Sequence, residues 1–485
     1  MDGGDMKNKI IALIVALLLL CTALTVFVGC NPNEGETKNK KVMLLLHGIG
    51  EGCLYNTETN QPVYSVTDFN GPELGTLLAG ITSTNPDTSL LKLLAVNEDG
   101  SLRDDDVIRP ANMDDTTGQY VMANLMKPLY DMLSAASYSD GYDIVIWQYD
   151  WRKHTDDIAA DLEAYIHSKG YEKVMLFTHS MGGLVSSSFF KKQANRDMTE
   201  LFIPFSTPFY GAVDTTYMMY EGLIASIPEM IDKFYVSVPE EFSSLISALG
   251  LKSADYCDGK PNPSVMYNKL MKMANNPIIK SFIDINSVLG ILKDLAKNLV
   301  SLYNLYPSEA YFESPLYAEG ESNFNYDGDP KTYEEFLAIF ETDPYLSEIV
   351  RMSNNELRPA FANLTAYQES LMPGGEQISN LVNTFYVQGN GVKTIKSAYA
   401  YSDGTPTTYD YFTYGDGLVS VWSGTAGLLR GDETPAQLAA LSDKVYIANG
   451  ENGRTGTSHL FIVFEEGVLN AVNTKVAATV AEIKG

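Results

Sequence analysis

The sequence has few of the residues that form metal sites and disulfides. Its 485 residues include four cysteines (Cys21, Cys30, Cys53 and Cys257) and five histidines, with no Cys-x-x-Cys pair. Structural zinc sites use closely spaced cysteine and histidine ligands, so this scatter predicts none. We expect neither a metal nor a cofactor. Cys21 and Cys30 belong to an N-terminal segment, which leaves Cys53 and Cys257 as one disulfide or two thiols.

Basic residues are also scarce. There are 34 Lys and Arg against 61 Asp and Glu, which gives a formal net charge of −27. Non-specific nucleic-acid binding needs clustered positive charge, so we expect no nucleic-acid partner. The acidic surplus indicates a well-solvated exterior instead. No repeat with a period of roughly 20–50 residues occurs, which argues against a solenoid or propeller. Apolar residues make up 45% of the chain, enough for a sizeable globular core.

Near the N-terminus an apolar run extends from Ile10 to Val28 and follows Lys7 and Lys9. This order is typical of an export signal. The run ends in Phe27-Val28-Gly29-Cys30, which resembles a bacterial lipobox. That resemblance implies cleavage before Cys30 and a diacylglycerol on its sulfur. We therefore expect a lipoprotein signal peptide over 1–29 and a tether over 30–40, with the body held at the outer face of a bacterial cell membrane. The alternative is a transmembrane anchor, because about 19 apolar residues nearly span a bilayer.

The most informative stretch is Thr178-His179-Ser180-Met181-Gly182-Gly183. The apolar, strand-like run 171–177 precedes it, and 184–192 can form a helix. A strand, a sharp turn at a serine and a helix together are typical of a nucleophile elbow. Gly182 lets the helix pass close by, because it has no Cβ. Thr178 replaces the first glycine of the G-x-S-x-G pattern, and the alternative interpretation is an ordinary Ser-Gly turn.

Around this stretch, strand-like and helix-like segments alternate. Apolar strands are predicted at 41–46, 142–149, 173–178 and 201–207, and later at 383–388 and 444–448. Helices are predicted at 120–133, 156–167 and about 459–483. Such alternation predicts a mostly parallel sheet with helices on both faces. The rhythm stops between 213 and 379, where helical patterns dominate. We therefore expect an α/β core over 41–212 and 380–485, interrupted by a largely helical cap over 213–379.

Four motifs occur in an order that resembles the order of motifs in one protein family. They are Tyr149-Asp150-Trp151-Arg152, His179-Ser180-Met181-Gly182, Thr207-Pro208-Phe209-Tyr210-Gly211 and Gly415-Asp416-Gly417. Together they resemble the lecithin:cholesterol acyltransferase-like family of α/β-hydrolases, and the cap segment 305–312 is similar to that family's Pro-Ser stretch. The resemblance covers roughly 41–465 and implies an α/β-hydrolase fold. It also implies transfer of acyl chains from phospholipids to an alcohol or to water. Two residues depart from the family pattern. Thr178 replaces the first glycine of the elbow, and Ser420 stands where a proline often follows the valine.

A serine hydroxyl is a weak nucleophile that needs a base, and histidine suits that role near neutral pH. A carboxylate must orient the imidazole, and in α/β-hydrolases the chain order is serine, acid, histidine. Only His459 follows Ser180 in the sequence, since the other histidines are His47, His154, His167 and His179. The order and the resemblance together assign the acid to Asp416. The competing acids are Asp403, Asp410 and Asp432.

Two backbone N–H groups must stabilise the oxyanion of the tetrahedral intermediate. Met181 supplies one, directly after the nucleophile. The turn after the first strand, which begins with His47, resembles the oxyanion-loop position of α/β-hydrolases. We assign the second donor to Ile49, with Gly48 and Gly50 as alternatives.

Asp150, Trp151 and Arg152 follow a predicted strand, at the edge where ligands approach open α/β sheets. We interpret Arg152 as a structural partner of Asp150 or another acid.

These features predict a lipid-anchored, extracytoplasmic serine hydrolase or acyltransferase that cleaves lipid esters through an acyl-serine intermediate. The apolar stripe of the cap, Ile285 to Leu299, either packs on its own neighbours or lines a channel for an acyl chain. An alternative function is an esterase or amidase with soluble substrates. A second alternative is an inactive binding lipoprotein that keeps the scaffold.

Overall fold

The computed structural model describes residues 40–64, 90–103, 106–110, 121, 125–136, 138, 141–216, 256–257, 260–261, 294–403, 408–450 and 456–484. The predicted signal peptide, most of the tether and most of residues 217–293 of the predicted cap lie outside these residues, as does the side chain of Cys257. Among the described residues, no helix is long and apolar enough to cross a membrane.

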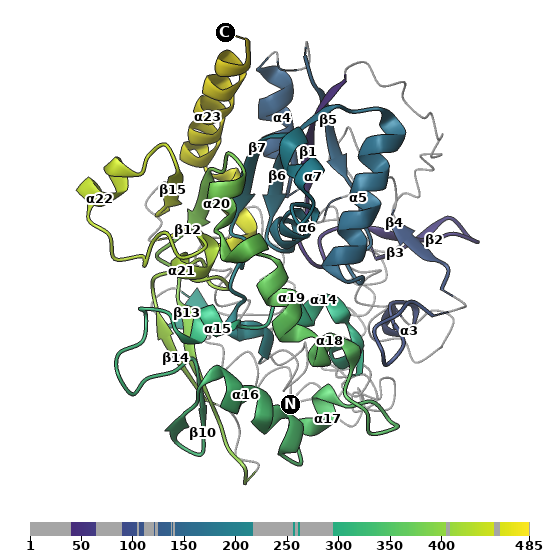
Figure 1. Ribbon diagram of the computed structural model, residues 1–485, viewed down its shortest axis with the longest axis vertical. Coiled ribbons are helices and arrows are strands. Elements are labelled where there is room, and N and C mark those ends of the chain that lie inside the picture. The colour runs from purple at the N-terminus through teal and green to yellow at the C-terminus, as the bar shows by residue number, and fades with distance from the viewer. Residues whose placement is uncertain are drawn as a thin grey trace, which may run out of the picture.

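The core of the fold is a six-stranded parallel sheet, in the upper half of Figure 1. Its order is β15 (Val445–Ala448), β12 (Tyr386–Gly389), β7 (Thr199–Phe205), β6 (Lys173–His179), β1 (Lys41–Leu46) and β5 (Asp143–Trp147). Every neighbouring pair in the sheet is parallel. The prediction of a mostly parallel sheet is therefore confirmed, with strand ends that differ from the predicted ones by a few residues.

Helices cover both faces of this sheet, as predicted. Val42 and Leu44 of β1 pack in one core cluster with α5 (Thr155–Lys169) and α6 (Met181–Phe189). Met43 of β1 packs in a second cluster with α4 (Lys127–Ala135) and α23 (Glu466–Lys484). Successive side chains of a strand point to opposite faces, so a strand covered on both faces is apolar at every position.

Two predicted helices differ from the observed ones. The helix expected at 120–133 begins at Lys127, with a proline in its first turn, and Val121 instead forms an isolated bridge with Gly52. The helix expected from His459 is divided into a 3₁₀ segment, η6 (His459–Phe464), and α23. Glu465 has an extended backbone (φ −76°, ψ 125°) that separates the two.

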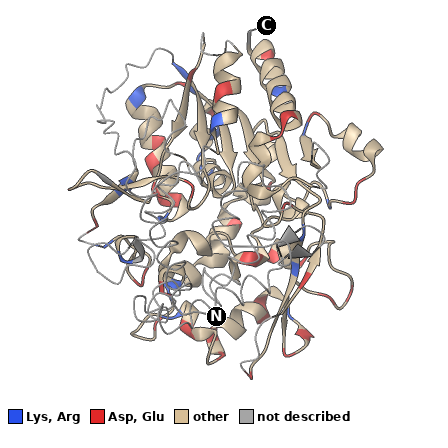
Figure 2. Ribbon diagram, turned by 180° about the vertical axis from the view of Figure 1, so that it is seen from behind, with Lys and Arg blue, Asp and Glu red and all other residues tan. Residues whose placement is uncertain are grey.

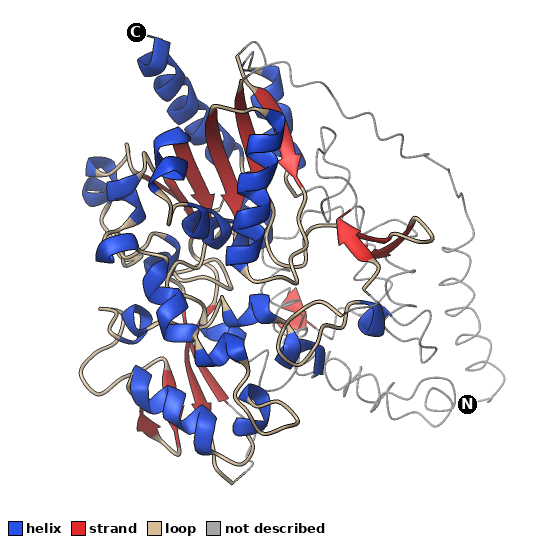
Figure 3. Ribbon diagram, turned by 45° about the vertical axis from the view of Figure 1, so that its right-hand side comes forward, coloured by secondary structure: helices blue, strands red, loops and turns tan. Residues whose placement is uncertain are grey.

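Below the central sheet in Figure 3 lies a second layer of short helices and a four-stranded sheet. The sheet has the order β11 (Asp329–Pro330), β10 (Phe324–Tyr326), β13 (Thr394–Ala400) and β14 (Thr408–Phe412). The helices of this layer are α14 (Val300–Tyr303), α15 (Glu309–Phe312), α16 (Tyr333–Thr342), α17 (Ser347–Val350), α18 (Pro359–Ala362), α19 (Leu364–Ser370), η5 (Pro373–Gly375) and α20 (Ile378–Leu381). The described part of the cap is thus largely helical, and strands from beyond its predicted end complete its sheet.

The remaining elements are short. A three-stranded sheet consists of β2 (Leu54–Asn56), β3 (Gln61–Tyr64) and β4 (Ile108–Pro110). The others are α3 (Leu90–Leu93), α7 (Gln193–Met198), β8 (Tyr256–Cys257), β9 (Lys260–Pro261), α21 (Val421–Gly424) and α22 (Pro435–Ala440). Acidic residues are spread over both layers (Figure 2).

Only the C-terminal end of the cap's apolar stripe lies among the described residues. Leu295 and Leu299 are buried in the same cluster as Val42 and Leu44 of β1, so this part of the stripe packs on its neighbours. Residues 285–292 lie outside the described part of the chain. One hydrophobic core therefore joins the central sheet to the described part of the cap.

Candidate active site

Ser180 lies in a sharp turn between β6 and α6. Its backbone has φ 51° and ψ −123°, a conformation that non-glycine residues seldom adopt. The Ser180 N–H donates to the carbonyl oxygen of Phe205 on the neighbouring strand β7, at 2.9 Å. The turn therefore lifts the serine above the end of β6 while its backbone stays tied to the sheet, which is the geometry of a nucleophile elbow.

Gly182 and Gly183 allow this geometry because α6 passes very close to other segments. A Cβ at Gly182 would lie 2.7 Å from the carbonyl oxygen of His47, and a Cβ at Gly183 would lie 2.0 Å from Thr207 Oγ1. Both distances are too short for a real contact. Thr178, which replaces the first glycine of the pattern, is fully buried and ends up within β6.

The structure brings Ser180, His459 and Asp416 together at the carboxyl edge of the sheet. His459 Nε2 lies 2.9 Å from Ser180 Oγ, and His459 Nδ1 lies 2.9 Å from Asp416 Oδ2. A carboxylate only accepts hydrogen bonds, so Nδ1 carries the proton and Nε2 accepts the serine O–H. The exposed fractions of the three residues are 6%, 3% and 1% for Ser180, His459 and Asp416. This arrangement can pass a proton from the serine to the histidine.

Asp416 is held as a carboxylate by several donors. Its Oδ1 accepts the N–H groups of Leu418 at 3.0 Å and Val419 at 2.7 Å, and its Oδ2 also accepts Gln388 Nε2 at 3.1 Å. Burial alone would raise the pKa of Asp416, but the charge and hydrogen bond of His459 and the Val419 N–H outweigh it and lower the pKa. The three competing aspartates, Asp403, Asp410 and Asp432, are exposed.

The predicted oxyanion turn lies beside the elbow. A Cβ at Gly48 would lie 2.9 Å from Ser180 Cβ, so this turn touches the nucleophile. The Gly48 N–H donates to a carboxylate oxygen of Glu51, which removes it from the candidate oxyanion donors. Ile49 and Gly50 are the remaining candidates in the turn. On the other side, Met181 is the first residue of α6, and its N–H has no acceptor within its own helix.

Glu51 and His179 form a buried ion pair that the sequence did not reveal. Glu51 Oε1 lies 2.7 Å from His179 Nδ1, and His179 Nε2 lies 2.8 Å from the carbonyl oxygen of His459. Burial alone would raise the pKa of Glu51, but the charge and hydrogen bond of His179 hold it below its usual value. Burial would lower the pKa of His179, but the Glu51 carboxylate raises it. Both shifts favour the charged forms of the pair.

His47 is a third buried histidine in this region. Its ring stacks on Tyr149 with centroids 4.0 Å apart and an angle of 10° between the planes. Its Nδ1 lies 2.8 Å from the carbonyl oxygen of Gly48, so Nδ1 carries the proton. Burial lowers the pKa of His47 to about 4. His47 is thus neutral, and it shapes the turn.

With this geometry in view, comparison with known proteins identifies the family. The family described as "Lecithin:cholesterol acyltransferase" matches residues 114–419. The chain belongs to this family. The matched residues include Ser180 and Asp416, whereas His459 and the turn at Gly48 lie beyond them.

One solved structure shares the fold. The structure described as "The crystal structure of Tle4-Tli4 complex" has a TM-score of 0.52 and 13% identity, and the match covers 91% of this chain and 99% of that chain. A second match is the lipase BlEst2 of Bacillus licheniformis in mature form, with a TM-score of 0.18 and 14% identity, covering 51% of this chain and 65% of that chain. No curated protein matches the sequence. The α/β-hydrolase fold predicted from the resemblance is confirmed.

Two of the lecithin:cholesterol acyltransferase motifs contact each other directly. Ser308 N–H donates to the carbonyl oxygen of Tyr210, and Ala212 N–H donates to that of Leu305, each at 2.9 Å. A Cβ at Gly211 would lie 2.0 Å from the carbonyl oxygen of Tyr306. The loop after β7 thus fixes the start of the described cap against the core.

Arg152 of the family motif forms buried ion pairs, as expected from the sequence. The Arg152 guanidinium is fully buried and pairs with Asp150 at 2.6 Å and with Asp106 at 2.8 Å. With both carboxylates, Arg152 joins the end of β5 to the segment before β4.

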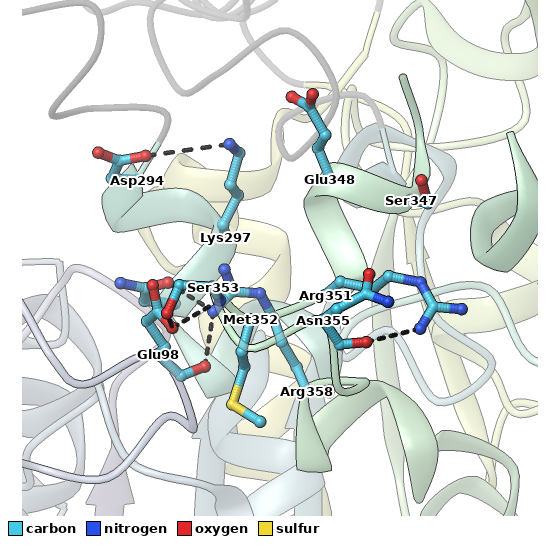
Figure 4. A pocket seen from close by; sticks show the side chains of 11 residues that line it. Glu98, Asp294, Lys297, Ser347, Glu348, Arg351, Met352, Ser353, Asn355 and Arg358 are labelled. Atoms are coloured by element: carbon cyan, nitrogen blue, oxygen red, sulfur yellow. Dashed lines mark hydrogen bonds and ion pairs between the residues drawn. The ribbon is translucent and has the colours of Figure 1, made fainter. Parts of the chain in front are cut away.

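A surface cavity of about 400 Å³ lies between the described cap and the segment that contains Glu98 (Figure 4). Its walls are polar and charged, and they include none of the residues around Ser180. They are Glu98, Asp294, Lys297, Asn298, Ser347, Glu348, Arg351, Met352, Ser353, Asn355 and Arg358. Arg358 donates to the carbonyl oxygen of Glu98 and to Asn298, and Arg351 donates to the carbonyl oxygen of Asn355. Such walls do not suit an acyl chain.

Proposed function

We propose that this protein is a lipid-anchored, extracytoplasmic serine hydrolase or acyltransferase that acts on lipid esters through an acyl-Ser180 intermediate. The observation that carries the proposal is the continuous hydrogen-bonded chain from Asp416 through His459 to Ser180 at the nucleophile elbow. Membership of the lecithin:cholesterol acyltransferase family supports acyl transfer as the reaction.

In the acylation step, Ser180 Oγ attacks the ester carbonyl carbon while His459 Nε2 takes the serine proton. Asp416 stabilises the imidazolium that forms. The carbonyl oxygen becomes an oxyanion, for which the N–H groups of Met181 and Ile49 are the proposed donors. When the intermediate collapses, the ester C–O bond breaks and the leaving alcohol takes the proton from His459. The acyl group then remains on Ser180.

In the second step an acceptor hydroxyl attacks the acyl carbon, and His459 removes its proton. The bond from the acyl carbon to Ser180 Oγ then breaks, and Ser180 takes the proton back from His459. Water as the acceptor gives hydrolysis, and an alcohol gives transfer. We expect hydrolysis to dominate, because no feature of the sequence specifies an alcohol acceptor.

The proposed anchor places this chemistry at a membrane. A diacylated Cys30 and a tether of residues 31–40 would hold the body at the lipid surface. The substrate would then meet the enzyme at an interface, and the inserted cap would control access to Ser180.

A panel of esters with increasing acyl length tests the substrate class. Each buried CH₂ contributes about 0.8 kcal/mol, so eight more carbons contribute roughly 6 kcal/mol if they are buried. We expect kcat/KM to rise steeply with chain length and to rise again when the ester is presented in vesicles. Adding an alcohol shows how the acyl group divides between water and transfer.

Two controls make this panel decisive. Ser180→Ala removes the nucleophile and reports background hydrolysis. Acetate esters report the chemistry with almost no acyl binding. Values of kcat/KM that fall with chain length and gain nothing at an interface would reject lipid esters, and would favour a soluble ester or amide substrate.

A further inference from the structure

The proposed mechanism makes no use of the ion pair between Glu51 and His179. This pair nevertheless contacts both the turn at Gly48 and the backbone of His459. The two side chains are each 2% exposed. One Glu51 oxygen accepts from His179 Nδ1 and the other accepts the Gly48 N–H. His179 Nε2 donates to the carbonyl oxygen of His459 at 2.8 Å. The pair therefore links the oxyanion turn, the end of β6 and the His459 segment.

The hydrogen-bond partners of the pair suit its charged form. A carbonyl oxygen only accepts, so His179 Nε2 carries a proton toward His459. Nδ1 faces a carboxylate oxygen of Glu51, which likewise only accepts when it is charged. The lowered pKa of Glu51 and the raised pKa of His179 favour the form in which His179 is an imidazolium and Glu51 is its counter-ion. Losing either partner would leave the other as an uncompensated buried charge.

We propose that Glu51 and His179 are positioning residues for acyl transfer, which hold the oxyanion turn and His459 in register with Ser180. This inference rests on the proposed function. On one side, Glu51 turns the Gly48 N–H away from the site, so that the next amide in the turn is the donor. On the other side, the His459 backbone is held at both ends. Its N–H donates to the carbonyl oxygen of Asp416 at 2.9 Å, and its carbonyl accepts from His179.

Charge compensation within the pair also matters to the reaction. The rings of His179 and His459 have centroids 4.9 Å apart. An unpaired positive charge on His179 would oppose the positive charge that develops on His459 when it takes the serine proton. The Glu51 carboxylate offsets that charge. His179 can therefore hold the His459 carbonyl without disfavouring proton transfer.

The Arg152 cluster provides a matched control. It is also a buried ion pair near the same edge of the sheet, and its guanidinium pairs with Asp106 and Asp150. None of these three side chains bonds to Ser180, His459 or Asp416 in the described structure. Asp106→Asn therefore perturbs a buried pair without touching the reacting groups.

Three variants distinguish the effect of the hydrogen-bond geometry from the effect of the charge of the pair. In Glu51→Gln, the amide oxygen can accept the Gly48 N–H and the amide nitrogen can donate to a neutral His179, so every hydrogen bond survives. Glu51→Met fills the same space without an acceptor. His179→Asn can keep a donor toward Glu51, but its side chain is too short to reach the His459 carbonyl.

The experiment measures kcat and KM for p-nitrophenyl butyrate, with the active fraction counted by a fluorophosphonate probe and the melting temperature taken for each variant. Misplacement by about 1 Å can lower a rate about 100-fold, so we expect that loss of kcat in Glu51→Met and His179→Asn, with KM changed less than about threefold. Glu51→Gln should keep kcat within about tenfold of the wild type, because its geometry is preserved. Asp106→Asn should lose melting temperature but keep kcat.

Unchanged kcat in Glu51→Met and His179→Asn, with only a lower melting temperature, would overturn the inference and leave the pair a purely structural one. If Glu51→Met does not fold, His179→Asn decides by the same criterion. Failure of the proposed function looks different. In that case the probe would leave Ser180 of the wild type unlabelled, and the inference would fall with it. A labelled wild type beside unchanged variants overturns the positioning role alone.

Discussion

Ser180 is held in a conformation that works against its own backbone preference. Positive φ at a non-glycine residue has an unfavourable free energy on the order of 1–3 kcal/mol and persists only where the surroundings enforce it. Here the bond from Ser180 N–H to Phe205 and the close approach of Gly182 to His47 enforce it. The serine is therefore fixed before any substrate arrives, which keeps its Oγ within reach of His459.

Replacing Ser180, Asp416 or His459 by alanine should lower kcat by several orders of magnitude. The three side chains act on one proton transfer, so a double variant should be little worse than the more damaged single variant. Steady-state kinetics of the single and double variants on one soluble ester measure this. Near-full activity in His459→Ala would show that another residue is the base.

The charged state of Glu51 and His179 predicts how stability changes with pH. The pKa of His179 is raised from 6.5. Its contribution to the free energy of unfolding is therefore complete below pH 6.5 and is lost as the pH rises through the folded-state pKa. The pKa of Glu51 is lowered from 4.5. Its contribution to the free energy of unfolding is therefore complete above pH 4.5 and is lost as the pH falls through the folded-state pKa. The titratable groups that face the pair are His47, Tyr64, Tyr149, Asp416 and His459.

Urea unfolding of wild type and Glu51→Gln across pH checks this prediction. The difference in unfolding free energy between them should be largest between about pH 4.5 and 6.5 and should shrink on either side. A difference that does not vary with pH would mean that the pair is uncharged in the folded protein.

At the scale of single residues, the sequence pointed to some members of this site and not to others. Ser180 is marked by its motif, and His459 by being the only histidine that follows it. The assignment of Asp416 as the acid depended on the family resemblance, because three other aspartates also lie between Ser180 and His459 as the chain order requires. Glu51 carried no local signal, since its partner His179 is 128 positions away and only folding brings them together.

At the scale of elements, strands covered on both faces were the easiest to predict. Their continuous apolar runs, such as 41–46, follow directly from burial by helices on each side. The sheet that contains β10 and β13 was not predicted. β10 has three residues, and its partner strand lies about 70 positions later in the chain, so no local pattern marks the pairing. Helix starts were also misplaced where, as at Lys127, no capping residue marks them.

The close packing of α6 predicts what alanine does at its two glycines. Alanine is favoured over glycine in a helix by about 1 kcal/mol, yet overpacking typically destabilises by about 1–3 kcal/mol. We expect Gly182→Ala and Gly183→Ala to lower the melting temperature. Thr207→Ala should partly rescue Gly183→Ala, because the clash there is with the Thr207 side chain.

The same substitution should not rescue Gly182→Ala, since that Cβ meets the backbone carbonyl oxygens of Leu46 and His47. Thermal melts of the two single and two double variants make the comparison. Equal rescue of both glycine variants by Thr207→Ala would contradict the packing described here.

At the scale of the whole molecule, the described cap is an integral part of the core. Phe336 and Phe340 of α16 belong to the same hydrophobic cluster as Val42 and Leu44 of β1. Gly211 and Tyr306 meet where the core chain leads into the cap. Substitutions in this shared core, such as Leu299→Ala, should therefore act on stability first, by about 2–5 kcal/mol for a buried leucine.

The proposed anchor concerns the part of the chain outside the described residues. If residues 1–29 are a lipoprotein signal, the mature protein should begin at a diacylated Cys30. Mass spectrometry of the protein from membranes should find the modified N-terminal peptide and nothing from the apolar run before it. Recovery of residues 10–28 in the mature chain would instead support a transmembrane anchor.

The most direct test of acyl transfer at Ser180 is labelling with a fluorophosphonate, which reacts with activated serines, followed by peptide mapping. In the wild type we expect one adduct per molecule, on the peptide that contains Ser180. Labelling should be abolished in Ser180→Ala and slowed by orders of magnitude in His459→Ala, because the base is missing. A folded wild-type protein that stays unlabelled, or that is labelled on a different serine, would contradict the account.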